Sequence, residues 1–155
     1  MSKHFASILL LAGIFALAST TLQADTIIQG GVSYTFTAGE ADGGGVFDEI
    51  LSIDTTGATV SGTLSSFSVQ FTGASNVVLE SVSSNAGSWS VLGKGPNTAN
   101  GCNINGSGNH WCASGSTITM TKGGADDSIY NFVFDVTMPS GTAPTRSDRT
   151  RPGIS

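Results

Sequence analysis

The sequence predicts an all-β protein, an antiparallel β-sandwich of about seven to nine strands that follows a cleaved signal peptide. Three observations lead to this prediction. Apolar and polar residues alternate with period two in several segments, and turn-forming residues rich in Gly, Asn, Ser and Asp separate these segments by roughly 8 to 15 residues. No segment after residue 24 keeps an apolar stripe at helical spacing.

The first 24 residues are typical of a secretory signal peptide. Lys3 supplies a positive charge, residues 5–18 are almost entirely apolar, and Leu-Gln-Ala at 22–24 precedes Asp25. The apolar run is shorter than the about 20 residues that a membrane-spanning helix needs. We expect cleavage after Ala24, with Ala-Leu-Ala at 16–18 as a competing site. The mature chain should then have no membrane span and be secreted, extracellular or at the cell surface, or periplasmic if it is not exported further.

Alternation is clearest in residues 32–38, 66–72 and 129–138, where aromatic and β-branched side chains occupy one face. Shorter pairs, Trp89 with Val91 and Ile118 with Met120, repeat the pattern. Residues 46–53 fit a strand or a single helical turn equally well. Together these segments favour an immunoglobulin- or cohesin-like sandwich.

One domain is expected, over residues 25–140, followed by a basic tail at 141–155. The tail contains Arg146, Arg149 and Arg151, the only arginines of the chain, and it has no apolar alternation. A segment of this composition cannot supply a buried strand face, so we expect it to be disordered.

The charge of the chain argues against two classes of partner. All eleven acidic residues but only five of the six basic residues follow residue 24, so the mature charge is −6. Between residues 25 and 140 the only cations are Lys94 and Lys122. Nucleic acid and anionic membranes, which are bound by clusters of Lys and Arg, are therefore disfavoured. Charged residues make up 11% of the chain, against about a quarter in typical proteins, which predicts a neutral, hydrogen-bonding surface.

Residues 93–115 form the one long irregular stretch, and they contain both cysteines, Cys102 and Cys112. In a secreted chain such a pair predicts a disulfide. Closing this short ring should contribute about 2.5–3 kcal/mol. A redox-active pair is disfavoured, because the two-residue spacing and the cationic neighbours that activate a thiol are absent.

Four residues of this stretch are candidates for ligand binding: Asn105, Asn109, His110 and Trp111. His110 is the single histidine after residue 24, which leaves no set of ligands for zinc and no triad, and we expect it to face solvent. Trp111 could stack against a sugar ring, but burial beside the disulfide is the favoured interpretation.

Two groups of acidic residues are candidates for calcium, namely residues 40–49 with Glu40, Asp42, Asp48 and Glu49, and the pair Asp126 and Asp127. Neither has the regular spacing of a known calcium loop, so the favoured interpretation is turn residues on a solvated surface. We expect no metal and no cofactor. The carboxylates define no glycosidase pair, and the chain has no Gly-x-Ser-x-Gly elbow on a strand-to-helix turn.

Three motifs carry a resemblance to a known family: Asn-Gly-Cys at 100–102, Trp-Cys-Ala at 111–113, and Tyr-Asn-Phe-Val-Phe-Asp-Val-Thr at 130–137. With the signal peptide, they resemble the secreted PEP-CTERM proteins of Gram-negative bacteria over roughly residues 61–140. The resemblance implies a surface or extracellular β-sandwich that an exosortase handles and that is associated with exopolysaccharide. It supplies no catalytic residues. The chain departs from the family at its end, where the Pro-Glu-Pro motif, apolar helix and basic cluster of the sorting tail are missing.

The expected function is that of a non-enzymatic secreted protein of the cell surface or matrix, with extracellular polysaccharide or other surface proteins as partners. The alternative is a carbohydrate-binding module that uses the segment between Cys102 and Cys112. A secreted hydrolase is the weakest hypothesis, because the chain shows no catalytic set.

Overall fold

The computed structural model describes residues 24–105, 108–123, 128–144 and 149–154. Almost all of the predicted signal peptide lies outside these residues. The described part of the chain forms eleven strands and one short 3-10 helix, η1 (Ser84–Ala86). The strands are β1 (Asp25–Gln29), β2 (Val32–Gly43), β3 (Val46–Asp54), β4 (Gly62–Phe71), β5 (Asn76–Val82), β6 (Trp89–Lys94), β7 (Asn97–Thr98), β8 (Gly101–Cys102), β9 (His110–Met120), β10 (Ile129–Thr137) and β11 (Arg149–Ile154).

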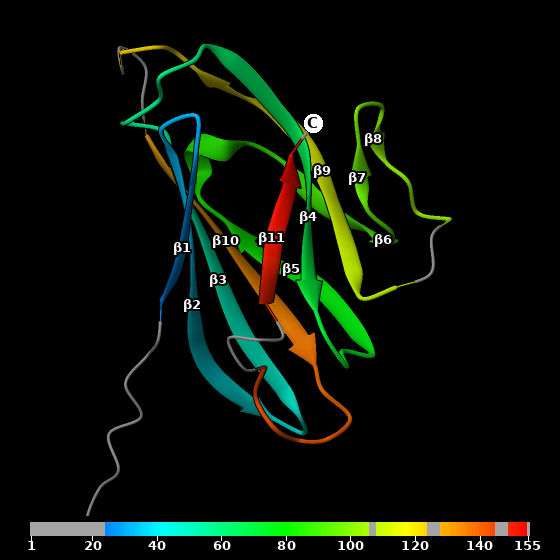
Figure 1. The fold of residues 1–155 in the computed structure, drawn as a ribbon. Coiled ribbons are helices and arrows are strands. Elements are labelled where there is room, and N and C mark those ends of the chain that lie inside the picture. Colours follow the sequence, from blue (N-terminus) through cyan, green and yellow to red (C-terminus); the bar gives the residue numbers. More distant parts are fainter. Residues whose placement is uncertain (1–23, 106–107, 124–127, 145–148, 155) are drawn as a thin grey trace, which may run out of the picture.

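The strands form two facing sheets, in which every neighbouring pair is antiparallel (Figure 1). One sheet has the order β1-β2-β3-β10-β5, and the other has the order β11-β4-β9-β6. The short strands β7 and β8 pair only with each other and form a hairpin outside the second sheet. This arrangement confirms the predicted all-β antiparallel sandwich. No helix in the described ranges has the length and apolar character needed to cross a membrane.

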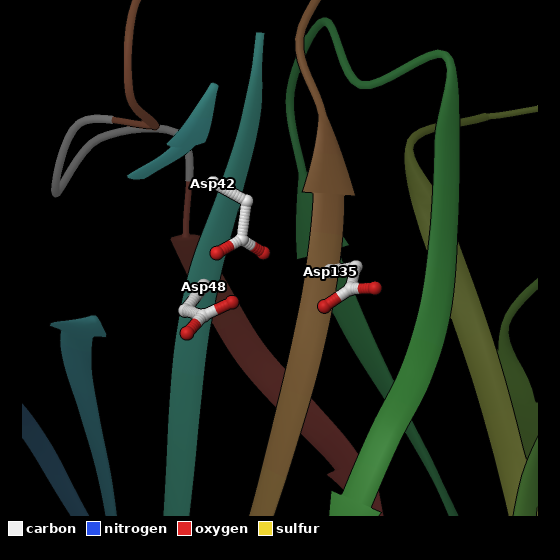
Figure 2. Close-up of side chains that lie close together, drawn as sticks. All are labelled: Asp42, Asp48 and Asp135. Carbon is white, nitrogen blue, oxygen red and sulfur yellow. The ribbon is translucent and has the colours of Figure 1, made fainter. Parts of the chain in front are cut away.

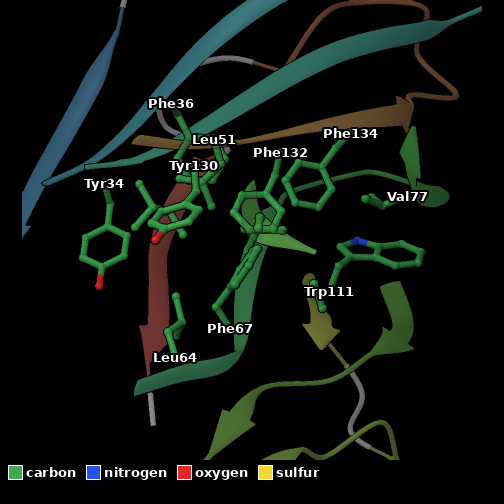
Figure 3. Close-up of a cluster of buried hydrophobic side chains, with 14 of the residues drawn as sticks. Tyr34, Phe36, Leu51, Leu64, Phe67, Val77, Trp111, Tyr130, Phe132 and Phe134 are labelled. Atoms are coloured by element: carbon green, nitrogen blue, oxygen red, sulfur yellow. The ribbon is translucent and has the colours of Figure 1, made fainter. Parts of the chain in front are cut away.

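The core lies between the two sheets and is rich in aromatic rings (Figure 3). Phe67 of β4 is fully buried, and its ring centroid lies 5.0 Å from that of Phe132 and 6.4 Å from that of Phe134, both on β10. Both contacts are edge-to-face, the geometry that aromatic quadrupoles favour. The inward residues are those that the period-two alternation predicted, because successive side chains of a strand point to opposite faces. In β2 they are Val32, Tyr34 and Phe36.

Residues 46–53, for which a strand and a single helical turn were equally expected, belong to strand β3. Two other segments differ from their predicted form. Strand β2 continues to Gly43, into one of the glycine-rich segments expected to separate strands, with irregular pairing after Ala38. The stretch 93–115, expected to be irregular, contains β7, β8 and the first half of β9. The strand count is therefore higher than expected, although two of the strands have only two residues each.

The C-terminal segment also differs from the sequence interpretation. Residues 149–154 form β11, which pairs antiparallel with β4 at the edge of the second sheet, where a disordered tail was expected. The physical reason is that strand pairing uses backbone groups, and without β11 the outer edge of β4 would offer such groups to any extended segment. Residues 145–148 and 155 lie outside the described part of the chain.

Candidate functional site

The hairpin of β7 and β8 is held against the outer face of the second sheet at three points. A disulfide joins Cys102 of β8 to Cys112 of β9, with 5.6 Å between their Cα atoms, which confirms the predicted bridge. Asn97 exchanges two hydrogen bonds with Ser66: its Nδ2 donates to the Ser66 carbonyl oxygen (3.1 Å), and the Ser66 hydroxyl donates to its Oδ1 (2.9 Å). The Gly95 N–H donates to the His110 carbonyl oxygen at 2.8 Å.

These contacts explain why two serines on the outer face of β4 are buried. Ser66 is 4% exposed and Ser68 is 2% exposed, although alternation placed both on the polar side of the strand. Ser66 lies under Asn97, and Ser68 is paired with Cys112 in the sheet register. The hairpin thus covers one part of the outer face and ends in the turn at Ala99 and Asn100.

A hollow of about 480 Å³ lies beside this hairpin. Its floor comes from three neighbouring strands, β4, β9 and β6, and the hairpin forms its wall. The lining includes two apolar side chains, Leu92 and Ala99, and five side chains with a hydroxyl or amide group: Thr63, Ser65, Ser66, Asn100 and Ser114. No charged residue lines the hollow, so it is suited to an uncharged polar ligand.

The four residues proposed from the sequence for ligand binding do not line the hollow. Trp111 is 6% exposed and points into the core between the sheets, so its predicted burial is confirmed (Figure 3). The Lys94 amino group lies 4.9 Å from the centroid of its ring. Stacking of Trp111 on a sugar, the alternative reading, is contradicted by this burial.

The other three candidates lie along the same segment. Asn105 and Asn109 are exposed, and the Asn109 carbonyl oxygen accepts a hydrogen bond from the Phe71 N–H. His110 begins β9 and is only partly exposed; its buried Nδ1 has no hydrogen-bond partner in the described residues. The expectation of a solvent-facing histidine is therefore only partly met.

A second group of side chains, the aspartate group of Asp42, Asp48 and Asp135, lies on the outer face of the first sheet (Figure 2). Asp48 of β3 and Asp135 of β10 are directly opposite each other in the sheet register, and one carboxylate oxygen of each of the three residues lies within 4.8 Å of the others. Gly39 of β2 leaves room for Asp48, because a Cβ at that position would collide with the Asp48 Cβ.

The pKa of Asp48 in the aspartate group is raised above its usual value. Burial raises the pKa of Asp48, and the neighbouring charges of Asp42 and Asp135 raise it further. The Oδ1 atoms of Asp48 and Asp135 are buried without a hydrogen-bond partner in the described part of the chain. The group can reduce its repulsion by taking up a proton or a cation, and its three carboxylates are the residues that could hold a metal ion.

The sequence interpretation of the acidic residues is wrong in part. Asp48 lies in strand β3, not in a turn, and Glu49 is fully buried on the opposite face of that strand. Asp135 was not among the predicted candidates, because only strand pairing brings it to Asp48. Its one signal was its position on the more polar face of the strand at 129–138. Asp126 and Asp127 lie outside the described residues.

Comparison of the chain with protein-family models, with curated proteins and with solved structures gave no match.

Proposed function

We propose that this protein is a non-enzymatic, secreted β-sandwich that acts at the cell surface or in the extracellular matrix. The disulfide supports export, because such bonds form and persist in oxidising compartments. The signal-like N-terminus and the resemblance to PEP-CTERM proteins point to the same location.

The non-enzymatic part of the proposal is supported by the hydrogen bonding of His110. A histidine that acts as a general base is normally oriented by a partner on its second ring nitrogen. The buried Nδ1 of His110 has no such partner in the described ranges, and this residue is the single histidine after residue 24. The acidic residues that the structure brings together lie on the outer face of the other sheet.

Cell fractionation and activity assays test this proposal together. The protein should be recovered from the medium or the cell surface without residues 1–24, and purified protein should turn over neither polysaccharides nor esters. A cytoplasmic protein that keeps its N-terminus would contradict the location. Turnover that is retained through purification and lost in His110→Ala would contradict the non-enzymatic role.

Carbohydrate binding is a second candidate function, favoured by the neutral polar hollow beside the hairpin. The segment between Cys102 and Cys112 then serves as the scaffold of a site, with the disulfide fixing its position. Extracellular polysaccharide would be the partner. Binding to a glycan array tests this function: reproducible, saturable binding supports it, and the absence of any bound glycan contradicts it.

A further inference from the structure

Three of the polar groups that line the hollow have no hydrogen-bond partner within the described residues. These are the Thr63 and Ser65 hydroxyl groups and the Asn100 side-chain amide. The Ser114 hydroxyl donates to the Ser65 carbonyl oxygen at 3.1 Å and keeps its lone pairs as acceptors. The hollow therefore presents several unused donors and acceptors within one small volume.

The wall of the hollow is fixed before any ligand arrives. The hairpin that carries Asn100 is covalently tied to β9 through Cys102, and Asn97 binds it to β4. Within the turn, the Thr98 hydroxyl donates to the Gly101 carbonyl oxygen at 3.0 Å, and the Asn100 N–H donates to the Thr98 hydroxyl at 3.3 Å. A fixed wall lowers the conformational entropy lost on binding, which favours recognition by weak individual contacts.

One side of the hollow is apolar. Leu92 lines it and is 50% exposed. An exposed aliphatic side chain beside a set of hydroxyl groups matches a ligand that has both C–H faces and hydroxyl groups. The volume of the hollow falls in the range of small-ligand sites, about 300–1,000 Å³.

We propose that this hollow binds a sugar unit of a neutral polysaccharide. Asn100, Thr63 and Ser65 would hydrogen-bond the sugar hydroxyl groups, and Leu92 would contact its C–H face. Anionic sugars should bind less well, because no cation lines the hollow to offset their loss of hydration. This inference rests on the second candidate function and goes beyond it by assigning the site and the class of sugar.

Titration of the full mature protein with oligosaccharides, followed by NMR, tests the inference. The probes are neutral gluco-, galacto- and manno-oligosaccharides, with oligogalacturonate as the charged comparison. We expect a neutral oligosaccharide to bind and Asn100→Ala to weaken its binding by about fivefold or more, the effect of one lost hydrogen bond. Ser65→Phe, which fills the hollow from an exposed position, should abolish binding.

Asn105→Ala is the matched control, because Asn105 is an exposed asparagine of the same segment that does not line the hollow. This variant should bind as the unchanged protein does. Binding that survives Ser65→Phe but is lost in Asn105→Ala would overturn the inference while leaving carbohydrate binding in place. Failure of every neutral oligosaccharide to bind, or binding of oligogalacturonate alone, would also overturn it. Turnover of a probe would overturn the non-enzymatic proposal instead.

Discussion

The aspartate group places like charges opposite each other on neighbouring strands, an arrangement that destabilises a sheet. In this group Asp48 lies opposite Asp135 of the neighbouring strand β10, and Asp42 lies close to both. Because the folded-state pKa of Asp48 is raised, folding favours its protonated form. The contribution of Asp48 to the free energy of unfolding should fall as pH rises from the unfolded-state pKa of about 4 through the higher folded-state pKa. Above the folded-state pKa this contribution should stay low.

Asp48→Asn should therefore stabilise the protein near neutral pH, by up to about 1 kcal/mol, the upper value for one cross-strand pair. This gain in stability should vanish at about pH 2.5, where the Asp48 carboxyl group is protonated and therefore uncharged, as the amide that replaces it is. Urea unfolding of both proteins at the two pH values measures the difference.

Asp54→Asn is the control of opposite sign. The Asp54 carboxylate accepts hydrogen bonds from the Thr56 hydroxyl (2.6 Å) and the Thr56 N–H (2.9 Å), and these bonds lower its pKa. Its contribution to stability is present above the unfolded-state pKa and is lost as pH falls through the folded-state pKa. This variant should destabilise the protein near neutral pH. If Asp48→Asn also destabilises it there, the repulsion inferred for the aspartate group is contradicted.

Phe67 joins the two sheets through contacts between aromatic rings. Its ring contacts Phe132 and Phe134 on the opposite sheet and lies 5.3 Å from the ring of Trp89 on its own sheet. Phe67→Ala should cost about 3–5 kcal/mol of unfolding free energy, because it leaves a cavity among rigid rings. Thermal unfolding should show a large loss for this variant and little change for Val78→Ala, which alters a side chain that is 48% exposed. Similar losses in both would show that Phe67 is not a central packing residue.

At the scale of elements, we expect the disulfide to be the main contact that holds the hairpin of β7 and β8 on the sheet. Without it, the remaining contacts with the sheet include the Asn97 and Ser66 pair and the hydrogen bond from the Gly95 N–H to the His110 carbonyl oxygen. Replacing Cys102 and Cys112 together by Ala should lower the unfolding free energy by about 2–4 kcal/mol. In this double variant, the rate of amide hydrogen exchange should increase more in residues 97–102 than in β10.

The bridge itself has a direct check. Trypsin cleaves after Lys94 and Lys122 and releases one peptide with both cysteines, whose mass without reduction should be lower by two hydrogen atoms. Two thiols that react with an alkylating reagent in protein purified from an oxidising compartment would contradict the bridge. Unchanged exchange in residues 97–102 of the double variant would instead show that the other contacts suffice to hold the hairpin.

The elements with strong alternation were predictable, and those defined by pairing were not. Strand β10 shows the first case, since Tyr130, Phe132 and Phe134 recur at period two and all face the core. Strands β7 and β8 show the second, because two residues are too few for any period. The same limit applies to the hollow, whose lining comes from segments far apart in the sequence. The disulfide was predictable, because the chain has only two cysteines. The position of the hairpin on the outer face of the sheet was not predictable.

At the scale of the whole molecule, each sheet of an open sandwich has edges, and β11 covers one of them. It pairs with β4 through Arg149 opposite Phe71 and Ile154 opposite Phe67, with an irregularity between. A long strand whose edge is unpaired is a template for pairing with another chain. In this protein few surface charges are present to oppose such association, because charged residues make up 11% of the chain.

A chain that ends at residue 144 should therefore self-associate and lose stability. Removal of β11 leaves the edge of β4 without partners, and the loss should be about 1–3 kcal/mol if two or three hydrogen bonds of about 1 kcal/mol each are broken. Gel filtration over a dilution series should show a concentration-dependent dimer or larger species for the shortened chain and a monomer for the full chain. Adding Gln70→Lys to the shortened chain places a charge on the exposed strand and should restore the monomer, since charged edge residues oppose strand pairing. If the shortened chain is instead monomeric at every concentration and as stable as the full chain, β11 does not protect the edge, and the sandwich is complete at β10.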